Sequence, residues 1–191
     1  MRLPLPSILI LLILAILATE MPMAFSAGTK AQIVDLVLDK SSENLEVSFR
    51  IAECFTPKME EAVQSGVPTT FRILVTIEKP SLVVIKSRVA EFVLEHTIKY
   101  NRLNNEYQVQ VPEDPRKVIV TKDFDEAKSW MSMVRSLQVT HKGLLDKDQD
   151  YVLKIKAELS KVELPLFFRY ILFWVSLWDF ETDWHKVDFS M

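Results

Sequence analysis

Apolar and polar residues alternate along most of the chain beyond its N-terminal segment. Successive side chains of a β-strand point to opposite faces, so this alternation predicts strands with one buried and one wet face. Two clear examples are LEVSFRI, residues 45–51, and AEFVLEHTIKY, residues 90–100. A polar connection over residues 101–106 predicts a hairpin. Up to residue 159, the predicted strands cover residues 33–38, 45–51, 71–77, 90–100, 107–111, 118–121, 137–141 and 151–159.

A short helix is predicted in the segment TPKMEEAVQSG, residues 56–66. Thr56 belongs to the residue types that cap the free N–H groups of a first helical turn, and Pro57 suits the first helical position. Gly66 can adopt the left-handed conformation that commonly ends a helix. These residues predict a helix that begins after Thr56 and ends before Gly66.

A second helix is predicted in DFDEAKSWMSMVRSL, residues 123–137. Asp123 and Glu126 stand at the spacing of a capping box, with Asp in place of the usual Ser or Thr. Apolar residues recur at helical spacing, at Phe124, Ala127, Trp130 or Met131, Val134 and Leu137. Each helix has one apolar face, so both should pack over a sheet or plug the end of a sandwich. The predicted fold is a single, mainly β domain of the α+β class, an antiparallel β-sandwich-like unit with two short helices.

The N-terminus has the layout of a secretory signal peptide, with Arg2, an uncharged apolar run and a more polar end that contains small residues. Cleavage after Ser26 places Ala24 and Ser26 at the two positions that require small side chains. An uncleaved anchor is the alternative, because the run approaches the about 20 residues that span a bilayer. We therefore expect residues 1–26 to be a signal peptide or an anchor, and residues 27–191 to be a periplasmic or otherwise exported domain.

The formal net charge of −3 does not suggest a nucleic-acid-binding protein, since such proteins need a basic face to displace counterions. Cys54 is the only cysteine, so an intramolecular disulfide is impossible. Its neighbourhood, with Ala52 and Phe55, is apolar. We interpret the thiol as a small buried hydrophobic group, with a reactive thiol as the alternative.

Residues 164–184, LPLFFRYILFWVSLWDFETDW, hold three of the four tryptophans. A second membrane span is disfavoured here, because burying Arg169 at the centre of a bilayer costs about 2.5–3.5 kcal/mol. As a strand, residues 164–177 are apolar on both faces, so they are either central in the fold or partly exposed and available to a partner. Residues 179–185 alternate and predict a strand with one wet face. The candidate interaction residues are Phe167, Tyr170, Phe173, Trp174, Trp178 and Trp184.

Two acidic segments match metal sites only in part. DKDQD, residues 146–150, begins like a calcium loop, but Tyr151 stands where glycine is needed and Ala157 where a bidentate glutamate is needed. We interpret this segment as a solvated turn before a strand. A second group shares one face of the predicted C-terminal strand and is interpreted as its solvated edge: Asp179, Glu181, Asp183 and His185. We predict no metal site.

No established catalytic motif is present: the chain lacks HExxH, GxSxG, GxxxxGK[ST] and GxGxxG. His96, His141 and His185 do not have the spacing of a ligand set. His96 interrupts an apolar stripe, which we interpret as a core imidazole with one hydrogen-bonded nitrogen. We therefore predict a protein that is not an enzyme, with no catalytic residue and no cofactor.

Five segments resemble, in this order, those of the exported bacterial proteins grouped as the DUF4390 family. They are EEAVQSGVPTTF, IKYNRLNNEYQV, DFDEAKSWM, ELPLFF and WDFETDW, and together they extend over almost the whole chain after residue 26. The family has no assigned activity, cofactor or catalytic residue, so the resemblance implies none. Its members are often encoded beside nitrogen-regulation-type sensor kinases, which implies a periplasmic or membrane-proximal partner.

Physical chemistry suggests structural roles for six positions in the matching segments. The first two end the first helix and start the next strand, and the next three set the hairpin with its cross-strand aromatic contact. The last marks the start of the apolar strand, because proline is tolerated at strand beginnings. These positions are Gly66, Pro68, Tyr100, Asn101, Tyr107 and Pro165.

We expect the chain to be a non-enzymatic protein-interaction module of the bacterial cell envelope, which docks its aromatic tail on an envelope or membrane protein such as a sensor kinase. The alternative is a carrier or sensor of an apolar ligand such as a lipid, which needs a cavity of several hundred Å³. A hydrolase would instead need a polar cleft with one of the three histidines and a carboxylate in hydrogen-bond reach.

Overall fold

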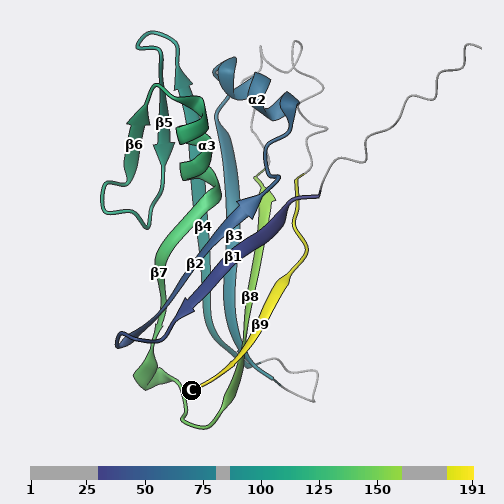
Figure 1. The fold of residues 1–191 in the computed structure, drawn as a ribbon, viewed down its shortest axis with the longest axis vertical. Helices are drawn as coiled ribbons and strands as arrows, with labels where there is room; N and C mark the ends of the chain where they lie inside the picture. Colours follow the sequence, from purple (N-terminus) through teal and green to yellow (C-terminus); the bar gives the residue numbers. More distant parts are fainter. Residues whose placement is uncertain (1–29, 81–86, 161–179) are drawn as a thin grey trace, which may run out of the picture.

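The computed structural model describes residues 30–80, 87–160 and 180–191, whose strands form two antiparallel sheets (Figure 1). The smaller sheet has the order β1 (Gln32–Asp39), β2 (Asn44–Ala52) and β7 (Met133–His141). The larger sheet has the order β6 (Val118–Thr121), β5 (Glu106–Gln110), β4 (Ser87–Asn101), β3 (Thr69–Lys79), β8 (Asp150–Leu159) and β9 (His185–Ser190). The helices are α2 (Pro57–Gln64) and α3 (Phe124–Ser132), with a short 3-10 turn, η1 (Lys142–Leu144). The predicted mainly β, α+β fold is confirmed.

The smaller sheet and the two helices cover one face of the larger sheet, and a hydrophobic core lies between the layers (Figure 1). On β3, the central strand between β4 and β8, the residues at alternate positions are fully buried: Phe71, Ile73, Val75 and Ile77. All eight strands predicted up to residue 159 are present as β1 to β8, although β7 begins earlier than predicted. Within the described part of the chain, no helix has the length and apolar character that crossing a membrane requires.

Helix α2 begins and ends on the residues that the sequence singled out. The Thr56 Oγ1 accepts a hydrogen bond from the backbone N–H of Met59 at 3.3 Å, and Pro57 is the first helical residue. Gly66 has φ +88°, and its N–H donates to the carbonyl of Val63 at 2.8 Å. The next N–H, of Val67, donates to the carbonyl of Ala62 at 3.0 Å. This pair of bonds is a Schellman motif, which satisfies two carbonyls at the end of the helix.

Helix α3 ends at Ser132, so the predicted helix through Leu137 is too long. Val134 and Leu137 lie in β7 and are both buried, although they are three positions apart. They pair with Phe49 and Val47 of β2, respectively, so β7 contains one more residue than β2 between these two pairs. That extra residue is a β-bulge, which keeps both side chains on the core face. A spacing of three therefore fitted a bulged strand as well as a helix.

The predicted hairpin joins β4 to β5. Tyr100 pairs with Tyr107 across the two strands, and their ring centroids lie 4.7 Å apart. The side chain of Asn101 shapes the turn, because its Oδ1 accepts hydrogen bonds from the backbone N–H groups of Leu103 at 3.1 Å and Asn104 at 3.4 Å. These contacts are local, and they fix the register of the two strands.

The C-terminal strand differs from the prediction for residues 179–185. Strand β9 begins only at His185, whereas Thr182 donates its N–H to the carbonyl of Ala157 at 2.9 Å and His185 pairs with Ile155. From Thr182 to His185 the tail moves three positions along the chain, whereas β8 moves only two, from Ala157 to Ile155. The extra residue reverses the alternation, so His185 is half-buried instead of lying on the wet face and Trp184 is 41% exposed. Residues 164–177, predicted as a strand apolar on both faces, lie outside the described residues.

Candidate functional site

His96 lies on the core face of β4 and is completely buried. Its Nδ1 is 3.0 Å from the backbone carbonyl oxygen of Met131, near the C-terminal end of α3. The last carbonyls of a helix lack partners within the helix, and a carbonyl can only accept, so the Nδ1 of His96 carries a hydrogen that it donates. His96 therefore fastens the end of α3 to the larger sheet.

The other ring nitrogen of His96 contacts Glu113, in the loop between β5 and β6. Nε2 lies 2.7 Å from Oε1 of Glu113, whose side chain is 7% exposed. One proton lies between the two atoms, on either the imidazole or the carboxyl group. In both arrangements the second oxygen, Oε2, is an acceptor, and it is buried without a hydrogen-bond partner among the described residues. An orphan buried acceptor costs about 1–3 kcal/mol.

Glu113 forms part of the wall of a pocket, named here the Glu113 pocket, with a volume of about 290 Å³. The pocket lies between the β5–β6 loop and the junction of α3 with β7. Four of its lining residues are apolar and four are polar or charged: Val111, Pro115, Trp130 and Met133, and Glu113, Asp114, Arg135 and Ser136. Such a mixture suits a small group that has both a hydrocarbon part and hydrogen-bonding atoms.

Two arginines flank the indole of Trp130. The guanidinium carbon of Arg135 lies 4.0 Å from the ring centroid, and that of Arg116 lies 4.7 Å from it. Arg116 in turn holds Asp114 through bonds from Nε at 2.9 Å and from Nη2 at 3.1 Å. The hydrogen bonds from Arg116 lower the pKa of Asp114 to about 2, so this carboxylate is ionised at any physiological pH. The loop side of the pocket is thereby tied to α3 by cation–π contacts.

The bulge in β7 shapes the opposite side of the pocket. Ser136 has φ +46°, a left-handed backbone conformation, and its N–H donates to the Oγ of Ser48 at 2.9 Å. Consecutive residues of a regular strand point to opposite faces, but because of the bulge Arg135 and Ser136 are both exposed. β-bulges commonly re-aim side chains near binding sites. Here the bulge brings two polar residues to the pocket from one strand.

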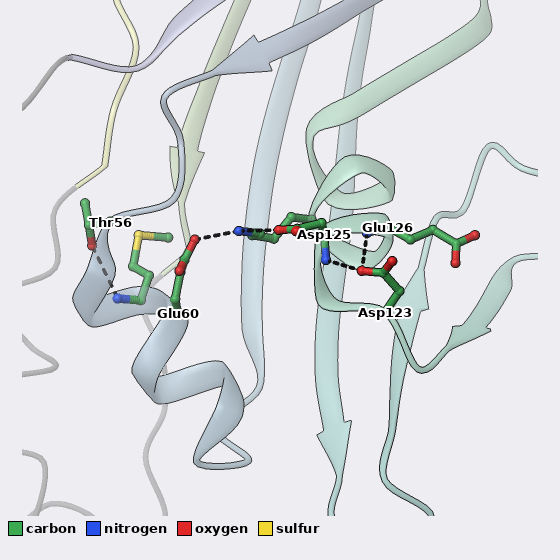
Figure 2. A network of polar contacts seen from close by, with 7 residues as sticks. Thr56, Glu60, Asp123, Asp125 and Glu126 are labelled. Carbon is green, nitrogen blue, oxygen red and sulfur yellow. Dashed lines mark hydrogen bonds and ion pairs between the residues drawn. The ribbon is translucent and has the colours of Figure 1, made fainter.

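Helix α3 is also held from its N-terminal half. Asp123 caps the helix, since its Oδ1 accepts from the N–H groups of Asp125 at 2.8 Å and Glu126 at 3.3 Å (Figure 2). Lys128 then joins the two helices: its Nζ lies 2.8 Å from Oε1 of Glu60 on α2 and 2.9 Å from Oδ1 of Asp125. The hydrogen bond with Glu60 raises the pKa of Lys128. These contacts fix the helix that carries Trp130.

The candidate interaction residues of the aromatic tail do not contribute to the pocket within the described structure. Trp184 belongs to the segment beside β8, near the edge of the larger sheet opposite to β6. The Nζ of Lys156 lies 5.8 Å from its ring centroid. The other members, together with Pro165, lie outside the described residues: Phe167, Tyr170, Phe173, Trp174 and Trp178.

Sequence reasoning missed Glu113, Trp130 and Arg135 as members of one site. His96 was interpreted correctly as buried, but it has two hydrogen-bonded nitrogens instead of one. The only signal was this polar residue in an apolar stripe, because a buried imidazole requires partners. Nothing in the local sequence pointed to Glu113, which is 17 residues away.

The remaining candidates lie elsewhere. His141 is exposed, with Nε2 at 3.9 Å from the exposed Glu43. Cys54 is buried, and its Sγ donates to the carbonyl of Ile51 at 3.2 Å. Burial raises the pKa of this thiol to about 12, so Cys54 is a packed side chain and not a nucleophile. Among the described residues, no group of three or more histidine, cysteine or acidic side chains is placed to hold a metal ion.

Comparison with family models matches residues 28–188 to a domain of unknown function, DUF4390. The chain belongs to the DUF4390 family. The match extends over the described sheets, the helices and the Glu113 pocket, so the pocket lies within the DUF4390 domain itself. Searches of the curated proteins and of the solved structures find no match.

Proposed function

We propose that this DUF4390 domain is a non-enzymatic interaction module of the cell envelope, and that it binds a partner protein through the Glu113 pocket. The observation that carries the proposal is the buried Oε2 of Glu113, which has no hydrogen-bond partner among the described residues and belongs to a residue that lines the pocket. A partner group that donates a hydrogen bond to this oxygen removes the cost of leaving it unpaired. Because Oε2 is itself buried, the donor reaches it through a small movement of the side chains around it.

Binding accounts for this arrangement better than catalysis does. The hydrolase hypothesis required a histidine in the cleft, but His96 is 0% exposed and both its nitrogens are engaged. A general base must come within hydrogen-bond reach of the proton that it abstracts. His96 instead positions the Glu113 carboxyl group and the end of α3.

The alternative partner, an apolar ligand such as a lipid, is less well supported. Three of the residues that line the pocket are charged: Glu113, Asp114 and Arg135. A volume of about 290 Å³ is at the lower limit for a small-molecule site. A polar group of a protein suits this lining better than an acyl chain, whose burial would leave the charged groups without water.

The proposed location in the cell envelope and the proposed kind of partner rest on two further expectations. The N-terminal residues 1–26 have the pattern of a signal peptide or anchor, which favours export. The DUF4390 resemblance implies a periplasmic or membrane-proximal partner, such as a sensor kinase. The aromatic tail that includes Trp184 is proposed as a second contact with the same partner.

A capture experiment with a matched control tests the proposal. The full chain, tagged at its C-terminus, is expressed in its own host beside the variants Glu113→Gln and Glu95→Gln. Glutamine keeps an oxygen for His96 but replaces the acceptor Oε2 with a donor, whereas Glu95 is exposed on the other face of β4. The cross-linked complexes are compared by quantitative mass spectrometry. We expect one envelope protein to be recovered with the unmodified chain and, in the same amount, with Glu95→Gln. With Glu113→Gln, we expect at least tenfold less of that protein. Equal recovery with Glu113→Gln would overturn the proposal.

A further inference from the structure

We infer that the partner group held in the Glu113 pocket is an uncharged amide, from an asparagine or glutamine side chain or from a peptide unit. This inference rests on the proposed function and specifies its ligand. Three properties of the pocket lead to it: its balance of charge, its hydrogen-bonding atoms and its apolar walls.

The charges around the pocket disfavour a cation. Glu113 shares one proton with His96, so this pair has no net charge. Arg116 neutralises Asp114, which leaves the guanidinium group of Arg135 as the uncompensated charge. An ammonium group in this space would face the positive charge of Arg135, and a carboxylate would place its own acceptor oxygens against the acceptor Oε2 of Glu113. Like charges brought together are costly, and so is a buried acceptor left without a donor, so the pocket disfavours both ions.

The hydrogen-bonding atoms of the pocket match an amide. The Oε2 of Glu113 is an acceptor that needs a donor. On another part of the wall, Arg135 carries five N–H donors in a rigid fork, and its Nε donates at 3.0 Å to the Sδ of Met133, a weak acceptor. An amide has an N–H for Glu113 and a carbonyl oxygen for Arg135. A hydrocarbon offers neither, and a single ion offers only one of them.

The apolar walls limit the size of the group. Val111, Pro115, Trp130 and Met133 can flank one or two methylene groups that lead to the amide. The volume of about 290 Å³ accommodates a short side chain or a single peptide unit. Trp130 lies against Arg135, so an amide bound by Arg135 changes the environment of this indole. Trp130 is thus a built-in probe of occupancy.

The test compares three probes of one size that differ in charge: propionamide, propionate and propylammonium. The full chain is purified from the envelope with its N-terminal segment as the cell leaves it and is labelled with ¹⁵N. The indole N–H signal of Trp130 is assigned by the loss of one peak in Trp130→Phe. We expect a saturable shift with propionamide, in the millimolar range typical of so small a ligand, and at least tenfold weaker binding of the two ions.

Two variants test the roles of the individual groups. Glu113→Gln is expected to weaken the binding of propionamide at least tenfold, whereas the control Glu95→Gln leaves it unchanged. Arg135→Ala removes the positive charge, so propylammonium is expected to bind this variant more tightly than propionamide does. A secondary amide, N-methylacetamide, separates the two sources: binding as tight as that of propionamide indicates a peptide unit, and weaker binding indicates a side-chain amide.

The inference is overturned if none of the probes gives a saturable shift, or if either ion binds the unmodified chain as tightly as propionamide. Its failure can be told apart from that of the proposed function. Capture of a partner that depends on Glu113, together with a preference for an ion, rejects the amide alone. Binding of propionamide without any partner that depends on Glu113 rejects the proposed function alone.

Discussion

The Nε2 of His96 lies 2.7 Å from the Oε1 of Glu113, and this buried contact joins the centre of β4 to the loop after β5. The same imidazole donates through Nδ1 to the carbonyl of Met131. One side chain therefore holds a strand, a loop and the end of a helix in place. The shape of the Glu113 pocket depends on this contact, because the loop and the helix end form its two sides.

Replacing His96 should be strongly destabilising. His96→Leu leaves two buried groups without their hydrogen-bond partner, the carboxyl group of Glu113 and the carbonyl of Met131. Each costs about 1–3 kcal/mol, so we expect the free energy of unfolding to fall by about 2–6 kcal/mol. The double variant His96→Leu/Glu113→Leu has no carboxyl group left without a partner. We therefore expect its free energy of unfolding to be higher than that of His96→Leu by roughly 1–3 kcal/mol. Urea unfolding of both variants measures the difference. If the double variant were less stable than His96→Leu, the loss of a hydrogen-bond partner for Glu113 would not explain the effect of His96→Leu.

Gly66 tests the end of α2. An added Cβ would meet Arg102 and Tyr100 only at ordinary contact distances of 3.7 and 3.8 Å, so space does not forbid a side chain. The backbone conformation does, because φ is +88° and L-residues in the left-handed region are strained by about 1–2 kcal/mol. We expect Gly66→Ala to lose about that much stability in urea unfolding. Gly66→Asn should lose less, because Asn tolerates this region; equal losses would contradict the conformational explanation.

Cys54 should be unreactive in the folded protein. Its thiol is buried and has a pKa raised to about 12 by desolvation, so at pH 8 almost none is present as the nucleophilic thiolate. We expect labelling with a chromogenic disulfide reagent to be slow in buffer and to become fast across the urea unfolding transition. Rapid stoichiometric labelling of the native chain would show that Cys54 is accessible and reactive after all.

Asp114 should give the fold a component of stability that depends on acid. Its folded pKa is lowered from 3.8 to about 2 by hydrogen bonds from Arg116, so folding favours the ionised carboxylate. This contribution is fully present above about pH 4 and is lost as the pH falls through 2. We expect the melting temperature of the unmodified chain to exceed that of Asp114→Asn at pH 5, with a gap that closes between pH 4 and 2. A gap independent of pH would show that Arg116 does not stabilise the charge.

Local patterns in the sequence were enough for much of the fold. The alternation of residues such as Phe71 and Ile73 predicted the strands, because the two-residue period of a strand is set by its own backbone. Thr56, Pro57 and Gly66 marked the ends of α2 for the same reason: each acts on backbone groups within a few residues. The hairpin between β4 and β5 likewise depends on contacts close in sequence, such as those of Asn101.

Where the prediction was wrong, a single extra residue shifted a strand register. The bulge at Ser136 turned a predicted helix end into β7, and the extra residue before His185 reversed the faces of the tail. Periodicity cannot reveal such a shift, since the partner strand decides which residue is left unpaired. The pocket depends on the same kind of information, because Glu113, Trp130 and Arg135 come from three different segments. The sequence alone therefore determined most of the strands and both ends of α2, through interactions within a few residues. Only the tertiary structure decided which of them meet, because packing of distant segments in one core sets the register of the strands and the partner of His96.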